Sequence, residues 1–378
     1  MALRIAFLST YPPTQCGLAT FTRSQVEQLV GRRDVEVGVV SLVDRAIADP
    51  PAPVVHQLES PIPGATRQAA ALLNTYDAVI VQHEYGIFGG RDGADVLDVL
   101  QRLRVPVITI LHTVLSEPTS HQHHVLDGVV RQSSALITMT GTARERLLAR
   151  WPSATPEEVL VMPHGAHPNE AAPDDPAPGG RRTLLTWGLL GPGKGIEWAI
   201  EALAELGELP EPPLYRIVGQ THPRVLEREG EAYRERLRAR AEELGVSELV
   251  AFDATYHDGD ELRRIVRGAD VVLLPYDSRE QVTSGVLTEA VVAGKPVIST
   301  AFPHARELLA DGTGLLVPQG DPHAMALALR RVLTEPELMA AMADRARAIA
   351  PTLHWSAVTD RLVELARELH STRARSVA

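Results

Sequence analysis

The stretch from Val271 to Thr300, VVLLPYDSREQVTSGVLTEAVVAGKPVIST, constrains the fold more than any other part of the sequence. Its first four apolar residues, followed by a proline, predict a buried parallel strand. After a polar loop, Thr283 and Ser284 are candidate N-caps of a short helix that carries Glu289. Strand, polar loop and helix N-terminus in this order are typical of the edge at which an α/β sheet binds an anionic ligand.

Buried strands alternate with amphipathic helices over the first half of the chain. One helix is expected over Ala19–Val30, with Phe21, Val26, Leu29 and Val30 on its buried face. This alternation predicts a right-handed, doubly wound parallel sheet. The expected strands are Ile5–Leu8, Val35–Leu42, Ala78–Val81, Val107–Leu111, Ala135–Met139 and Val159–Met162.

The same alternation restarts after residues 168–181, which are rich in Pro, Ala, Gly and Asp and are predicted to form a linker. We therefore expect two Rossmann-like domains, 1–167 and 182–350, followed by a terminal helical segment, 351–370. The tail after His370 is expected to be frayed. The expected strands of the second half are Thr183–Thr186, Tyr215–Val218, Val271–Leu274, Val297–Ser299 and Gly314–Val317, and the helices are Glu197–Leu206, Arg224–Leu244 and Pro322–Leu333.

Composition excludes several classes of protein. A chain of 378 residues is long enough for two domains, and its formal charge of −11 argues against nucleic-acid binding. The single cysteine, Cys16, excludes an internal disulfide and suits a reducing cytoplasm. Neither a signal peptide nor a membrane-spanning apolar run is visible. We expect a cytoplasmic protein, and weak association with a membrane surface stays open.

The second half begins with a glycine-rich loop in the segment TLLTWGLLGPGKGIEWAIEAL. Such a loop exposes backbone N–H groups, and Lys194 adds a positive charge beside them, which suits a phosphate group. Residues 188–194 also satisfy the GxxxxGK part of a P-loop, but Gly195 stands where the Mg²⁺-binding Ser or Thr should be. Taken alone, the loop could also be a glycine-rich helix start with a solvated lysine.

Several motifs in order make the pattern specific. The second half contains GLLGPGKGIEWAIEAL, YRIVGQTHP, ADVVLLPYDSREQVTSGVLTEAVVAGKPVIST and DGTGLLVP. The first half contains FLSTYPPTQCGLATFTRSQVEQL, VQHEYGIFGG, ITILHTVL and VMPHGAHP. From about residue 4 to Trp355 the chain resembles retaining GT-B glycosyltransferases of family GT4. It is most similar to a subgroup with CG-x-ATF, HTVL and Q-x-TSG segments.

This resemblance implies an α/β GT-B fold, in which two Rossmann-like domains with doubly wound parallel sheets face an interdomain cleft. It also implies transfer of a hexosyl group from a UDP- or GDP-linked sugar to a hydroxyl acceptor, with retention and without a bound metal or other cofactor. The segment from Pro351 to Trp355 and the helix after it resemble the family's terminal segment, which crosses back onto the N-terminal domain. That segment could act as a hinge that closes the cleft.

The resemblance also assigns roles to individual residues. Lys194 would neutralise the donor diphosphate, Glu289 would bond the donor ribose, and His112 would lie near the transferred sugar. These three carry the expected catalytic roles. The expected donor-binding residues are Gly17, Gly188, Gly193, Gly219, Glu280, Gln281, Thr283, Ser284 and Gly285, and the expected acceptor-binding residues are Cys16, His83 and Glu84.

Two positions depart from the family pattern. Leu189 stands where the family commonly has an arginine, and the position eight residues before Glu289 is Gln281 in place of a glutamate. Either the Gln281 amide substitutes, or a shift of the loop brings Glu280 into place. Two further hypotheses stay open: a catalytically degenerate GT-B domain and a P-loop-like nucleotide hydrolase.

The cluster of His121, His123 and His124 has a spacing that resembles a metal site. No carboxylate or cysteine pattern completes it, so a polar helix start is the preferred interpretation. No residue stands out as a covalent nucleophile.

Overall fold

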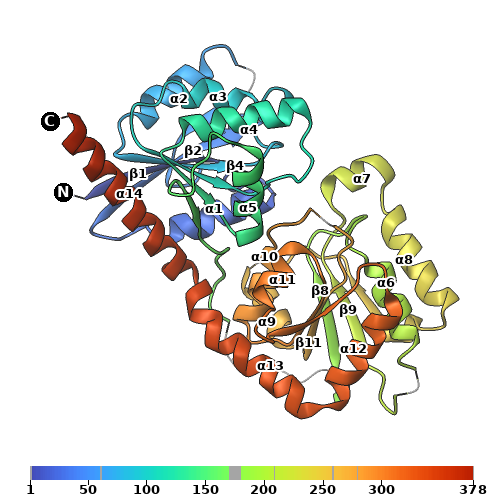
Figure 1. Cartoon of the computed structure of the whole chain (residues 1–378). Coiled ribbons are helices and arrows are strands. Elements are labelled where there is room, and N and C mark those ends of the chain that lie inside the picture. Colours follow the sequence, from blue (N-terminus) through green and yellow to red (C-terminus); the bar gives the residue numbers. More distant parts are fainter. Residues whose placement is uncertain are drawn as a thin grey trace. The chain divides into compact units, whose positions relative to one another are not determined.

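The computed structural model describes residues 2–59, 62–169, 180–207, 209–257, 259–278 and 280–377. The chain divides into two compact units, Met1–His164 with Trp355–Ala378, and Gly165–His354. Each unit is built on one parallel sheet with helices packed on it (Figure 1). Residues 170–179 of the expected linker lie outside the described part of the chain.

The first unit contains a seven-stranded parallel sheet in the order β3-β2-β1-β4-β5-β6-β7. All six strands predicted from the sequence are present. The sequence pattern missed β3, because this edge strand is half-exposed, interleaves polar residues such as His56 and Gln57, and follows a proline-rich turn. The strands are β1 Leu3–Ser9, β2 Val35–Val43, β3 Val54–Glu59, β4 Ala78–His83, β5 Val107–Leu111, β6 Ala135–Thr138 and β7 Val159–Val161.

Helices cover this sheet and bury its apolar faces, with Ile5, Phe7, Ile80 and Ile108 fully buried in the core. One expectation is wrong: Val30 is 58% exposed, because the first helix already ends at Glu27. The helices before the second unit are α1 Gly17–Glu27, α2 Ala65–Leu73, the 3₁₀ turn η1 Arg91–Gly93, α3 Asp95–Leu100, α4 Ser120–Gln132 and α5 Gly141–Arg150.

The second unit contains a six-stranded parallel sheet in the order β10-β9-β8-β11-β12-β13. The predicted strands are again present. The sequence pattern missed the short edge strand β10, whose residues are only partly buried. The strands are β8 Thr183–Trp187, β9 Leu214–Val218, β10 Val250–Asp253, β11 Val271–Leu274, β12 Val297–Thr300 and β13 Gly314–Val317.

The charged helix predicted over 224–244 is two helices, α7 and α8. Gly230, with a φ of 59°, ends the first of them, and Leu226 on that helix is 47% exposed. The helical segments are α6 Ile196–Ala204, α7 Pro223–Glu229, α8 Ala232–Glu243, η3 Ser247–Leu249, α9 Gly259–Arg267, α10 Gly285–Val292, α11 Pro303–Leu308, α12 Pro322–Thr334, α13 Pro336–Ile349 and η4 Ala350–Leu353.

The last helix, α14 (Trp355–Val377), packs in the first unit (Figure 1). Trp355 and Leu362 join the core of that unit, and the Arg361 guanidinium donates a hydrogen bond to the Val161 carbonyl oxygen at 3.2 Å. The expectation of a frayed tail is wrong for residues 371–377, which continue the helix.

In each sheet the strand order reverses once, between β1 and β4 in the first and between β8 and β11 in the second. The loops after two neighbouring strands diverge at such a switch point and leave room for a ligand at the carboxyl edge of the sheet. Lys194 and Tyr276 lie in the two loops at the second switch point.

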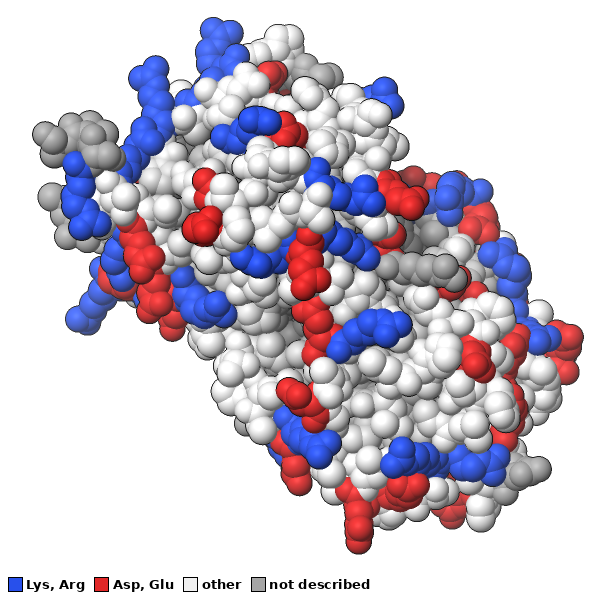
Figure 2. Space-filling model, viewed as in Figure 1, with Lys and Arg blue, Asp and Glu red and all other residues white. Residues whose placement is uncertain are grey.

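The surface shown in Figure 2 carries basic and acidic side chains interspersed with one another. In the part of the chain that the structure describes, no helix combines the length and the apolar character needed to cross a membrane.

Candidate active site

The first residues of the loop after β8 continue the sheet-like hydrogen bonding to the end of β9 and the segment after it. The Gly188 N–H donates to the Val218 carbonyl oxygen at 3.0 Å, and the Leu190 N–H donates to that of Gln220 at 2.9 Å. Gly219 adopts a φ of 130°, and a Cβ atom there would lie 2.1 Å from the Gly188 carbonyl oxygen. Only glycine allows this approach, so two of the predicted donor-binding glycines, Gly188 and Gly219, lie together.

Lys194 ends this loop with its ammonium group over an aromatic ring. Its Nζ lies 4.3 Å from the centroid of Tyr276, and the Asp277 N–H donates to the Gly193 carbonyl oxygen at 3.0 Å. The loops after β8 and β11 are therefore tied together. Among the described residues no carboxylate forms an ion pair with Lys194, so its charge is left for an anionic ligand.

The next residue, Gly195, shows why the P-loop pattern is incomplete. Its φ is 62°, and a Cβ atom would lie 1.9 Å from the Pro275 carbonyl oxygen. A serine or threonine cannot occupy this backbone position without displacing the loop after β11. The two loops approach so closely at Gly195 that there is no room for the Ser or Thr side chain whose hydroxyl binds Mg²⁺ in a P-loop.

Tyr276 is held firmly beneath the lysine. Its ring is fully buried and stacks on Phe302 with a centroid distance of 5.3 Å. Its carbonyl oxygen accepts a hydrogen bond from the Thr300 hydroxyl at 2.6 Å, and the Gln319 side-chain amide donates to the Ser278 carbonyl oxygen at 2.9 Å. The cation-π support of Lys194 is therefore built into the fold.

Glu289 lies on α10 and contacts the end of β8. The Trp187 indole N–H donates to its carboxylate at 3.2 Å. Burial raises the pKa of the Glu289 carboxyl, and the Trp187 hydrogen bond and the charge of Arg263 partly oppose this rise. Lys194 and Glu289 thus both lie at the carboxyl edge of β8. From the sequence, only the family resemblance had placed them in one site.

The turn before α10 differs from expectation in one respect. Ser284 was predicted to bind the donor, but its N–H donates to Nδ1 of His304 at 2.8 Å. Gly285 is the first residue of α10, where a helix leaves its N–H without a helical partner. Gln281 is half-buried and Glu280 is exposed.

Thr283 precedes Ser284 in this turn. Its hydroxyl is buried without a hydrogen-bond partner among the described residues. A ligand or a water molecule is therefore needed to satisfy it.

In the first unit, Cys16 is the N-cap of α1. Its sulfur accepts a hydrogen bond from the Ala19 N–H at 3.3 Å and lies 3.3 Å from the Thr10 hydroxyl oxygen. Both contacts give the thiol a role within the loop after β1. Gly17 follows as the first residue of the helix, and a Cβ atom there would meet nothing within 4 Å. The helix start is therefore open at Gly17.

His112 lies at the end of β5 in a chain of buried amides. Its Nε2 is 2.7 Å from Oε1 of Gln82, whose Nε2 donates to Oε1 of Gln25 at 2.7 Å. Because the Gln82 oxygen accepts, the proton of the imidazole belongs on Nε2 and Nδ1 keeps its lone pair. Burial, with smaller contributions from His164 and His83, lowers the pKa of His112 to about 3. The ring is therefore neutral at physiological pH.

His83 lies in a strand, whereas the strand predicted from the sequence ends at Val81. It is the last residue of β4 and 1% exposed, and neither ring nitrogen has a hydrogen-bond partner among the described residues. Burial lowers its pKa to about 4. Glu84 follows outside the strand and accepts hydrogen bonds from the Gly86 N–H at 3.2 Å and the Thr113 hydroxyl at 3.4 Å. Of the two predicted acceptor contacts on this segment, Glu84 is the more accessible.

The histidines at the start of α4 have local partners. Nδ1 of His121 is 2.8 Å from the Asp92 carboxylate, and the His123 ring stacks on Trp151 at 5.0 Å. Thr119 and Gln122 form a capping box at this helix start. Within the described residues, no group of His, Cys, Asp and Glu side chains has the arrangement of a metal site.

Comparison with known proteins identifies the second unit. Residues 169–349 match the family model described as Glycosyl transferases group 1. The chain carries a group 1 glycosyl transferase domain. This domain contains the Lys194 loop, Tyr276 and Glu289, and thus the whole of the edge described at β8 and β11.

Two curated relatives of the chain bear the same name. D-inositol 3-phosphate glycosyltransferase from Acidothermus cellulolyticus is 30% identical over 301 residues, covering 72% of this chain and 64% of the relative. The protein of the same name from Stackebrandtia nassauensis is 32% identical over 256 residues, covering 63% and 54%. The matched region thus spans less than two thirds of the length of either relative.

Solved structures confirm the GT-B fold. Anabaena HepE in complex with UDP superposes with a TM-score of 0.78 at 17% identity, covering 97% of this chain and 100% of HepE. At this identity the likeness concerns the fold, which includes both sheets.

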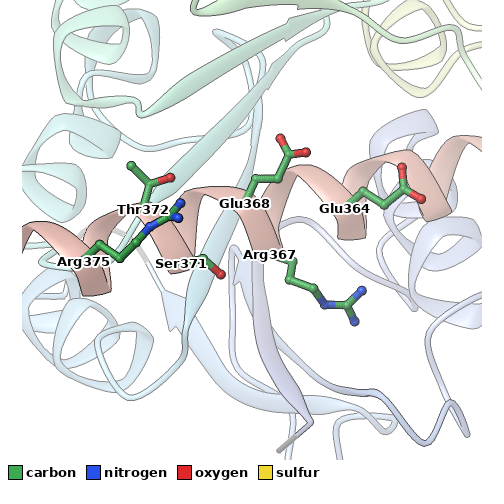
Figure 3. Close-up of a pocket in the computed structure, with 6 residues that line it drawn as sticks. All are labelled: Glu364, Arg367, Glu368, Ser371, Thr372 and Arg375. Atoms are coloured by element: carbon green, nitrogen blue, oxygen red, sulfur yellow. The ribbon is translucent and has the colours of Figure 1, made fainter.

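A surface hollow of about 500 Å³ lies along one face of α14 in the first unit (Figure 3). The side chains that line it come from successive turns of this single helix and alternate in charge. They are Glu364, Arg367, Glu368, Ser371, Thr372 and Arg375. None of the residues that line the hollow lies within residues 169–349, which match the family model.

Three residues that contact predicted site residues were not predicted from the sequence. Trp187 and His304 lie in the second unit, and Gln82 lies in the first. Trp187 and Gln82 each follow directly on a strand predicted from the sequence, and their polar contacts cross to other elements. His304 carried one usable signal, since it follows the strand next to the predicted anion-binding loop and lies two residues beyond an aromatic residue.

Proposed function

We propose that this protein transfers a hexosyl group from a UDP- or GDP-linked sugar to a hydroxyl acceptor, with retention at the anomeric carbon. The observation that carries the proposal is the placement of Lys194 and Glu289 at one edge of β8, beside the glycine pair Gly188 and Gly219. It is supported by relatives named as D-inositol 3-phosphate glycosyltransferases and by HepE, which was solved with UDP and with UDP-glucose.

Lys194 would stabilise the leaving nucleoside diphosphate. Negative charge grows on the phosphate as the glycosidic bond breaks, and a preformed cation stabilises that charge more than it stabilises the bound donor. The buried Tyr276 ring holds the ammonium in place without neutralising it. No metal ion is needed in this scheme, and Leu189 in place of arginine leaves Lys194 as the main cation.

Glu289 would accept hydrogen bonds from the ribose hydroxyls of the donor. A carboxylate accepts such bonds through several lone pairs, and the Trp187 indole N–H fixes one of its oxygens. Gln281, half-buried in the loop before α10, would contact the sugar through its amide in place of the usual glutamate.

In the reaction, the bond from the anomeric carbon to the phosphate oxygen breaks. The acceptor oxygen forms its bond to the same face of that carbon, and the acceptor proton passes to the leaving phosphate. This front-face course follows the resemblance to family GT4. The acceptor would contact Glu84 in the first unit, and no further cofactor takes part. Placement in the cytoplasm stays a prediction from composition.

His112 should contribute to transfer as a neutral hydrogen-bonding group. With a pKa of about 3 and its proton on Nε2, it would accept a hydrogen bond from a sugar hydroxyl through Nδ1. We expect His112→Ala to lower kcat about 10- to 100-fold and to leave nucleotide affinity unchanged. The pH dependence of kcat should show no ionisation of His112 above pH 5. Unchanged turnover in the variant would remove His112 from the mechanism.

Nucleotide binding tests the proposal as a whole. Thermal unfolding is measured with UDP, GDP, ADP and ATP, each with and without Mg²⁺. A ligand at a hundred times its dissociation constant stabilises the folded state by about 2.7 kcal/mol, which shifts the midpoint measurably. We expect a metal-independent shift with UDP or GDP, followed by sugar transfer in a donor screen.

Two other results would favour other functions. Binding without transfer would indicate a degenerate GT-B domain, as Leu189 and Gln281 allow. A shift that requires both ATP and Mg²⁺ would indicate a nucleotide hydrolase.

A further inference from the structure

The end of β12 and the segment after it pack against the loop that carries the candidate donor site. Thr300 bonds the Tyr276 carbonyl oxygen, and Phe302 stacks on the Tyr276 ring. Two residues further on, His304 lies on α11, is 4% exposed, and accepts the Ser284 N–H through Nδ1 at 2.8 Å. The segment from Thr300 to His304 therefore holds the loop after β11 at both of its ends.

Ser284 depends on this contact because its other polar groups are used by α10. Its hydroxyl oxygen accepts the Leu287 N–H at 3.2 Å, and its carbonyl oxygen accepts the Thr288 hydroxyl at 3.2 Å. The residue is buried, so its N–H has no access to water in place of the histidine. An unpaired buried N–H is costly, and the turn would have to move to satisfy it.

The contact requires a particular form of the imidazole. Nδ1 can accept the Ser284 N–H only while it carries a lone pair, which places the ring proton on Nε2. His304 is thus a hydrogen-bond acceptor at this point. His304 is the second residue of α11, a short helix that follows the buried strand β12, so the backbone fixes where its ring begins.

The contact also decides which groups of the turn are left for a ligand. With the Ser284 N–H occupied, the N–H of Gly285 at the first position of α10 and the buried hydroxyl of Thr283 stay available. Glu289 lies one helical turn beyond Gly285. A shift of the turn would therefore displace these three groups together.

We propose that His304 is a positioning residue that sets the start of α10 for nucleotide-sugar binding. This inference rests on the proposed function and names a residue outside the candidate site assigned from the sequence. His304 acts through Ser284, and it needs no contact with the donor.

Two amide substitutions that differ by one methylene group separate the position of the hydrogen-bond acceptor from the loss of the ring. In His304→Asn the oxygen Oδ1 is attached to Cγ, as Nδ1 is, and can accept the Ser284 N–H. In His304→Gln the oxygen is one bond further out, at the position of Nε2. His304→Ala removes the acceptor. All three proteins are compared with the wild type by UDP and GDP titration calorimetry, and by hydrogen exchange of peptides that cover residues 283–292 without nucleotide.

We expect His304→Ala and His304→Gln to weaken nucleotide binding about tenfold, which corresponds to the loss of one buried hydrogen bond. Both should speed exchange over residues 283–292. His304→Asn should restore affinity to within about threefold and slow the exchange again. Equal behaviour of the Asn and Gln variants, or unchanged exchange in His304→Ala, would overturn the inference.

The binding measurement also separates this inference from the proposed function. If the wild type binds no nucleotide, the proposed function fails, and with it the donor-positioning role of His304. If the wild type binds UDP or GDP and all three variants bind equally well, the proposed function stands and the role of His304 is refuted.

Discussion

Replacing Lys194 by alanine should lower kcat for sugar transfer about 10²- to 10³-fold, the loss expected when one preorganised group that stabilises developing charge is removed. The ammonium lies over the Tyr276 ring and forms no ion pair with the carboxylates of the described residues. Its removal should therefore leave thermal stability nearly unchanged. Steady-state kinetics, together with unfolding curves for both proteins, measure the two effects separately.

The chain provides a control for this substitution, because Lys194 and Lys295 are its only lysines. The Lys295 ammonium donates to the Arg267 carbonyl oxygen at 2.6 Å, and burial lowers its pKa. We expect Lys295→Met to change stability and to leave kcat of the folded protein unaltered. Similar losses of kcat in both variants would show that Lys194 acts through stability and not through the leaving group.

Much of the second unit could be predicted from the sequence because its signals are local. The apolar run of β11, the capping Ser284 and the glycines of the Lys194 loop each depend on neighbouring residues. The alternation of strands and helices then predicted the doubly wound sheets. The two missed strands, β3 and β10, are short edge strands with few buried residues, so hydrophobic periodicity is weak there.

Contacts between distant segments could not be predicted in the same way. The predicted strand ends at Val81 because Gln82 and His83 interrupt the apolar run, yet both are buried at the end of β4. Gln82 is accommodated there by Gln25 and His112, which come from two other elements. For Ser284, a sequence signal shows that the residue caps a helix, but it does not show that His304 already occupies its N–H.

Helix ends were misjudged where a single residue decides them. Gly230 divides the helix predicted over 224–244, although Arg and Glu residues continue on both sides. In α14, by contrast, the sequence from Ser371 onward contains no glycine or proline, and the helix continues to Val377. Local helix propensity was the better guide there than proximity to the chain end.

Substituting serine for Gly195 should destabilise the second unit by about 3–5 kcal/mol, among the largest effects expected of a single change. The new Cβ atom would lie 1.9 Å from the Pro275 carbonyl oxygen, and the φ of 62° disfavours any side chain. The contact is with backbone, so relief requires the loops after β8 and β11 to separate. Urea or thermal unfolding of the variant measures the loss.

Gly193→Ser is the matched control, because this glycine lies in the same loop with a φ of 89°, but a Cβ atom there would meet nothing within 4 Å. It should cost only the backbone strain, about 1–2 kcal/mol. Equal losses in the two variants would show that the contact with Pro275 is not formed.

Gly195→Ser also completes the P-loop sequence pattern, so a gain of Mg²⁺-dependent ATP hydrolysis would support a hydrolase ancestry for the loop. We expect no such gain. The added side chain would clash with the Pro275 carbonyl oxygen and would disrupt the loop geometry that holds Lys194 over Tyr276.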